Sequence, residues 1–72
     1  MYDYDYSKLL GRIKEKGFTQ ETLAPKLGIS ACSLNLALNN NREFKQEELV
    51  KACETLDIPL AKIADYFFTH KL

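Results

Sequence analysis

The sequence has little of what metal, redox and cofactor sites are built from. Its two cysteines, Cys32 and Cys53, lie far apart, form no Cys-x-x-Cys motif and have no histidine near them. Metal sites and redox pairs need such residues at close spacing. The single histidine, His70, lies near the end of the chain, so we expect it to be solvated. The sequence therefore predicts no metal, no cofactor, and two free thiols in a reducing cytoplasm.

The chain also lacks a constellation of residues for catalysis. Catalysis would need a nucleophile with a base in reach, paired carboxylates or a metal cluster. Glu47 and Glu48 are adjacent in the sequence. Because neighbouring residues diverge around a helix, we expect both to be solvated charges at a helix N-terminus. The sequence predicts that the protein is not an enzyme.

Long hydrophobic runs and an excess of one charge are absent too. No stretch approaches the roughly 20 apolar residues of a membrane span, and no basic region followed by an apolar run opens the chain. We therefore expect a cytoplasmic protein, in a bacterial host cell, with no membrane partner. Ten basic and ten acidic residues cancel, so the molecule brings no net attraction to the phosphates of DNA. A modest basic patch remains in one predicted helix, formed by Lys8, Arg12, Lys14 and Lys16.

What is present predicts one small helical domain that covers residues 1–72. Gly17 and Gly28 are expected to end the first two helices, and Pro59 to start the fifth. Apolar residues recur at helical spacing between these breaks. The predicted helices cover residues 7–16, 20–27, 31–38, 46–56 and 60–67, with an extended N-terminal segment over residues 1–6 and a tail over residues 68–72.

Both ends of the chain are rich in aromatic residues, and each end has two interpretations. Tyrosine and aspartate alternate in residues 1–6, as in a short strand. These tyrosines either pack on the domain or form a contact arm for a partner. The tail, from Tyr66 onward, either closes the core as a lid or forms a dimer or partner surface, since exposed apolar patches often mark interfaces.

Residues 19–38 have the pattern of a helix, a three-residue turn and a second helix. Thr19 and Ser30 are good N-caps, and Gly28 is a good helix stop. Pro25 falls beyond the first turn of the first helix, where we expect a kink; the alternative is that this helix starts later. The second helix turns one face inward, with Leu34, Ala37 and Leu38, and leaves Ala31, Cys32, Asn35 and Leu36 on its other sides.

One set of residues in this stretch is specific: Thr19-Gln20-Glu21, Leu23-Ala24, Leu27-Gly28-Ile29-Ser30, Leu34, Leu38 and Asn39. It resembles the helix-turn-helix of the lambda repressor-like (Cro/CI) superfamily, and the five-helix spacing agrees over about residues 7–67. The resemblance implies an all-α, compact five-helix DNA-binding fold. The small size and the aromatic C-terminus are most similar to Cro-like proteins of temperate phages of Gram-positive bacteria. These include modulators of repression, which act in the lysis-lysogeny switch opposite a CI repressor.

The resemblance also implies a binding surface. Gln20 would hydrogen-bond a DNA phosphate, and the loop of residues 39–42 would do the same. Among the residues at base-reading and groove-facing positions, only Asn35 has a side chain that can form bidentate hydrogen bonds with a base edge. The expected partner or DNA-binding surface consists of Gln20, Pro25, Ala31, Cys32, Ser33, Asn35, Leu36, Asn39, Asn40 and Arg42.

Two functions fit this surface. In the first, the protein is an antirepressor that binds the N-terminal domain of its cognate phage CI repressor and blocks or alters its DNA binding. In the alternative, it is an autonomous Cro-like repressor that binds operator DNA, as a dimer on a two-fold site. Zero net charge, and an exposed Leu36 beside Ala31 and Cys32, favour the protein partner. Operator DNA would then be contacted weakly or through the repressor complex, and a homodimer stays open.

Overall fold

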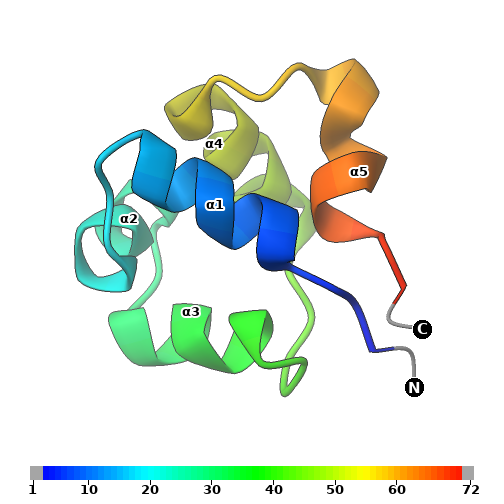
Figure 1. The fold of residues 1–72 in the computed structure, drawn as a ribbon. Helices are drawn as coiled ribbons and strands as arrows, with labels where there is room; N and C mark the ends of the chain where they lie inside the picture. Colours follow the sequence, from blue (N-terminus) through cyan, green and yellow to red (C-terminus); the bar gives the residue numbers. More distant parts are fainter. Residues whose placement is uncertain (1–2, 71–72) are drawn as a thin grey trace.

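The computed structural model describes residues 3–70, which form five α-helices and one short 3₁₀-helix (Figure 1). Within these residues there is no strand, only an isolated antiparallel bridge between Tyr4 and His70. The all-α, five-helix fold predicted from the sequence is confirmed. None of the described helices is long and apolar enough to cross a membrane. The elements are α1 (Ser7–Glu15), α2 (Gln20–Leu27), α3 (Ala31–Leu38), α4 (Gln46–Leu56), η1 (Leu60–Lys62) and α5 (Ile63–Phe67).

The core lies between the helices, with α2 packed against α3 and α4, and α1 against α5 (Figure 1). The predicted inward face of α3 is confirmed, because Leu34, Ala37 and Leu38 are all buried. Burying one such leucine stabilises the fold by about 1.5–3 kcal/mol. The largest fully buried side chains are Leu9, Leu23, Leu34, Leu56 and Phe67.

The first four helices end in the same way, at a residue with left-handed backbone angles. The φ values are 79° at Gly17, 75° at Gly28, 62° at Asn40 and 54° at Asp57. After each of these, the next amide donates back to a carbonyl in the last turn of the helix, which satisfies an otherwise unpaired oxygen. These donations are Phe18 N to Ile13 O, Ile29 N to Ala24 O, Asn41 N to Leu36 O and Ile58 N to Cys53 O, at 2.8–3.1 Å.

Pro25 lies inside α2 without shortening it. The helix begins at Gln20 because Thr19 caps it: Thr19 Oγ1 accepts from the Thr22 amide at 3.2 Å, and Thr22 Oγ1 accepts from the Thr19 amide at 2.8 Å. The alternative of a later start is therefore wrong. The proline removes one donation, to the carbonyl of Glu21, which lies on an exposed residue where water can replace it.

The fifth predicted helix differs from the structure in its first turn. Residues 60–62 form η1, and α5 begins only at Ile63. A 3₁₀ turn has three residues, so it shifts the phase of an apolar stripe that was read at α-helical spacing. As a result Leu60 is 64% exposed and Ala64 is exposed, and only Ile63 and Phe67 of the predicted stripe pack on the core.

Candidate partner-binding surface

The starts of α2 and α3 lie next to each other and enclose a shallow hollow on the surface. Its lining includes four residues that the sequence predicted to share a binding surface, namely Gln20, Ala31, Cys32 and Asn35. Ser33 lies on the same helix but its amide and hydroxyl are both engaged with the Ser30 hydroxyl, at 3.1 Å. The structure thus brings four candidates of α2 and α3 together. The α2–α3 surface below means these four with the exposed neighbours Leu36 and Asn39.

Three of its amide side chains bind one another. Asn35 Nδ2 donates to Gln20 Oε1 at 3.0 Å, which joins α3 to the first residue of α2. Asn39 Nδ2 donates to the main-chain carbonyl of Asn35 at 2.9 Å and to its Oδ1 at 3.2 Å. A base edge would therefore compete with an existing partner for the Asn35 amide. These hydrogen bonds link the exposed amides of α2 and α3 into one chain.

On its α3 side the α2–α3 surface carries no charge, because α3 contains neither an acidic nor a basic residue, whereas on its α2 side Glu21 lines the hollow. Leu36 is 40% exposed, and Cys32, one helical turn before it, is exposed as well. Pro25 is exposed on the neighbouring α2. An uncharged helix face of apolar and amide side chains matches the composition at the core of protein–protein interfaces.

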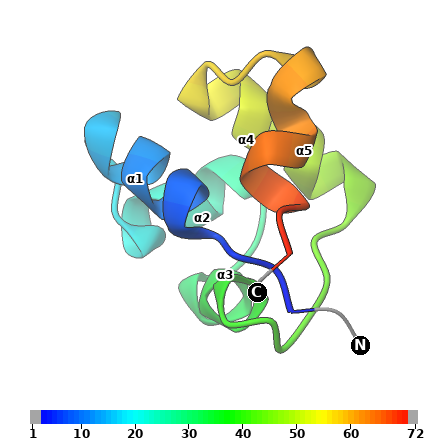
Figure 2. The same cartoon turned by 45° about the vertical axis from the view of Figure 1, so that its right-hand side comes forward.

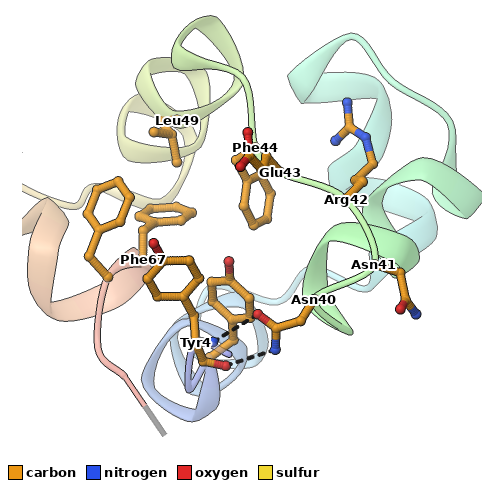
Figure 3. Close-up of a pocket in the computed structure, with 10 residues that line it drawn as sticks. Tyr4, Asn40, Asn41, Arg42, Glu43, Phe44, Leu49 and Phe67 are labelled. Carbon is orange, nitrogen blue, oxygen red and sulfur yellow. Dashed lines mark hydrogen bonds between the residues drawn. The ribbon is translucent and has the colours of Figure 1, made fainter. Parts of the chain in front are cut away.

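Asn40 lies in the loop that was predicted to contact a partner, but both polar atoms of its side chain bind within the chain. Its Oδ1 accepts from the Tyr4 amide at 2.9 Å, and its Nδ2 donates to the Tyr4 carbonyl at 3.0 Å (Figure 3). The residue is half-buried. Asn40 thus ties the loop after α3 to the N-terminal segment, a contact that local sequence patterns do not reveal.

Arg42, the predicted cation of this loop, is held by Glu48. The two guanidinium Nη atoms donate to the two carboxylate oxygens at 3.0 Å, and Glu48 is only 4% exposed. The expectation that Glu48 is a solvated charge is therefore wrong. Its position at the third residue of α4 lets it accept from the Lys45 amide at 3.0 Å, which turns the side chain back toward the loop. The hydrogen bonds from Arg42 hold the pKa of Glu48 below its usual value.

The basic patch predicted in α1 is largely neutralised by ion pairs. Lys8 lies 4.0 Å from Asp65, Lys16 lies 2.9 Å from Asp57, and Arg12 pairs with Glu15. Arg12 also donates to the carbonyls of Leu56 and Asp57 at the end of α4, at 2.9 and 3.0 Å. These three carboxylates and two carbonyls belong to the chain itself, so three of the four cations of the patch are already paired within the molecule.

The two chain ends meet in an aromatic cluster beside a pocket of about 410 Å³ (Figure 3). Phe67 is buried and contacts Phe44, with ring centroids 5.3 Å apart, and Phe44 contacts the buried Tyr6 at 5.7 Å. Phe67 therefore closes the core, as the lid interpretation predicted, whereas Phe68 is 46% exposed. The predicted end segments also include residues 1–2 and 71–72, which lie outside the described residues. Sequence reasoning missed this pocket, because its lining comes from both ends of the chain and from the loop before α4.

The two cysteines and the histidine are the remaining residues whose state the sequence predicted. Both cysteines are free thiols: Cys32 is exposed, and Cys53 is buried in α4, where burial raises its pKa. His70 is exposed, and its ring lies 5.4 Å from that of Tyr4. Residues 3–70 contain no group of three or more metal-ligating side chains.

Comparison with known proteins places the whole of this fold in a family. A family model described as "Protein of unknown function (DUF739)" matches residues 2–70. The solution structure of the modulator of repression (MOR) of the temperate bacteriophage TP901-1 from Lactococcus lactis is similar, with 42% sequence identity and a TM-score of 0.76. That match covers 90% of this chain and 88% of the phage protein. No curated protein sequence matches this one. Because the family model covers every helix, the chain belongs to the DUF739 family.

Proposed function

We propose that this protein modulates repression in a temperate phage by binding the N-terminal domain of its cognate CI repressor. The binding would occur through the α2–α3 surface and would block or alter the contact of the repressor with its operator. The likeness to a phage modulator of repression supports a role of this kind, since it extends over 90% of the chain at 42% identity.

The uncharged exposed face of α3 is the observation that carries the proposal. Leu36 presents apolar area there, and α3 contributes no charge that would lose its water on binding. Gln20, Asn35 and Asn39 supply amide groups beside this face, and hydrogen bonds join them to one another. Ordered side chains lose less conformational entropy when a partner binds, which favours affinity.

Direct operator binding, as by a Cro-like repressor, is the second candidate. Gln20 at the start of α2 and Asn35 on the exposed side of α3 support it, because both could donate to DNA. The electrostatics oppose it. The net charge is zero, and Arg12, Lys16 and Arg42 are paired within the chain. Affinity for DNA backbone depends on cations that neutralise phosphates, so operator binding by the protein alone should be weak.

Two titrations at about 0.15 M salt separate these candidates. One measures binding to the N-terminal domain of the CI repressor encoded by the same phage, and the other measures binding to the operator of that phage. We expect saturable binding of the repressor domain at nanomolar to micromolar concentration, and weak binding of the operator. Tight, salt-sensitive operator binding without repressor binding would overturn the proposal and favour the Cro-like alternative.

A further inference from the structure

The loop after α3 and the N-terminal segment are joined through one side chain, and this joint has a consequence for binding. We propose that Asn40 is a positioning residue: by holding residues 3–6, here called the terminal arm, it fixes the C-terminal end of α3. The arm thereby contributes to partner binding although it does not line the hollow of the α2–α3 surface. The binding half of this inference rests on the proposed function.

The terminal arm is bound on two sides. On one side the side-chain amide of Asn40 forms two hydrogen bonds with the main chain of Tyr4, at 2.9 and 3.0 Å, in the way that a neighbouring strand would. On the other side the Asp5 amide donates to the carbonyl of Thr69 at 2.6 Å, and Tyr4 forms an antiparallel bridge with His70. Figure 2 shows the first described residues, in blue, and the last, in red, coming together beside α3. The arm is thus wedged between the C-terminal segment and Asn40.

The same Asn40 closes the last turn of α3. Its φ of 62° is uncommon for a residue with a side chain, although asparagine tolerates it better than most. In this conformation the main-chain amide of Asn40 donates to the carbonyl of Ala37 at 3.2 Å, and that of Asn41 donates to the carbonyl of Leu36 at 2.8 Å. Asn40 therefore does two things: its backbone conformation closes α3, and its side chain holds the terminal arm.

The last turn of α3 carries the part of the surface that the proposed function needs. Leu36 supplies a carbonyl to the closing turn, and Asn39, the helix C-cap, holds Asn35 through its side chain. Ala37 and Leu38 anchor the buried side of this last turn in the core, and the closing turn and the arm hold its exposed side. Releasing Asn40 from Tyr4 should loosen this turn, and binding would then have to order it again at a cost in affinity.

A glycine variant isolates the side chain from the backbone. Asn40→Gly removes both bonds to Tyr4 but keeps the left-handed conformation accessible. Asp57→Gly is the matched control, because within residues 3–70 Asp57 is the other non-glycine residue with positive φ. Its carboxylate binds Lys16, a residue of the segment after α1. Asn40→Asp keeps an acceptor for the Tyr4 amide but loses the donor to the Tyr4 carbonyl, and it serves if the glycine variant unfolds.

Two measurements test the inference, one on the free protein and one on the complex. In Asn40→Gly we expect faster hydrogen exchange at the amides of Tyr4 and Asn41, and shifted amide resonances of Leu36 and Asn39. Affinity for the repressor N-terminal domain should fall by about fivefold or more, as for the loss of one or two hydrogen bonds. Asp57→Gly should leave both readouts unchanged, and Asn40→Asp should lie between.

Wild-type affinity in Asn40→Gly, together with lost protection at Tyr4, would overturn the inference, because the arm would then be released without consequence for binding. If the wild-type protein binds no repressor domain, the proposed function fails instead. The NMR and hydrogen-exchange measurements on the free protein then still test whether the arm and the end of α3 are coupled. Unchanged resonances of Leu36 and Asn39 in Asn40→Gly would in that case overturn the coupling itself.

Discussion

Arg42 and Glu48 form a two-pronged ion pair, in which both guanidinium Nη atoms lie 3.0 Å from carboxylate oxygens. The pair joins the loop after α3 to the first turn of α4, and it buries the carboxylate almost completely. Arg42 is the only cation of residues 39–42, and the pair uses it to stabilise the fold. The loop that the family resemblance links to phosphate contact thus has its charge neutralised from within.

Removing Arg42 should destabilise the protein strongly, because Glu48 would be left as a buried charge without its cation. We expect Arg42→Ala to lower the free energy of unfolding by about 3 kcal/mol. Urea denaturation at pH 7 measures this value. Glu43→Ala, at the exposed neighbouring residue, is the control and should change stability by about 0.5 kcal/mol or less. Equal effects of the two substitutions would show that the ion pair contributes nothing.

The same pair predicts how stability depends on pH. The pKa of Glu48 is lowered in the folded protein by hydrogen bonds from Arg42, and then by the Lys45 amide, against the opposing effect of burial. The stabilisation is therefore fully present above the ordinary pKa of 4.5 and is lost as the pH falls through the folded value. Because Asp57 shifts in the same direction, we compare wild type with Glu48→Gln. The stability difference between them should shrink below about pH 4.5; a constant difference down to pH 2 would contradict this assignment.

The two thiols should differ sharply in reactivity. Cys32 is exposed on α3, whereas Cys53 is 3% exposed and its pKa is raised by burial. Since the thiolate is the reactive form, iodoacetamide should alkylate Cys32 in the folded protein and reach Cys53 only on unfolding. Mass spectrometry should find one adduct per native chain and two after denaturation. Two adducts formed at equal rates under native conditions would show that α4 opens readily.

Leu36 should be a centre of binding energy if the α2–α3 surface meets the repressor. Leu36→Asp places a charge on the uncharged exposed face of α3, and we expect the affinity for the repressor domain to fall at least about 30-fold, a loss of about 2 kcal/mol. Leu60→Asp is the matched control, because Leu60 is also exposed but lies on η1, away from this surface. Calorimetric titration of both variants tests the prediction, and equal affinities for the two would remove Leu36 from the interface.

Features of the fold with a local signal could be predicted from the sequence. Thr19 and Ser30 cap their helices as expected, and Gly17 and Gly28 end theirs, because a cap or a left-handed stop involves only nearby residues. Asp57 ends α4 in the same left-handed conformation, yet aspartate at this position carries no comparable signal. Local sequence signals thus predicted where the helices lie, but they did not predict every helix end.

The candidate site was predictable as a set of residues but not as a set of contacts. The sequence assigned Gln20 and Asn35 to one surface, and the structure adds that they bind each other. Whether two side chains meet depends on how α2 and α3 cross, which spacing within one helix does not determine. The bond between Asn40 and Tyr4 joins residues 36 positions apart, so it follows only from the assembled fold.

Mapping the complex by NMR tests the central claim most directly. Isotope-labelled protein is titrated with the unlabelled N-terminal domain of the cognate repressor, and the amide resonances are followed. We predict that the largest shifts fall on the α2–α3 surface, at Gln20, Ala31, Cys32, Asn35 and Leu36. Saturable shifts confined to α4 and α5, with the α2–α3 surface unmoved, would contradict the account.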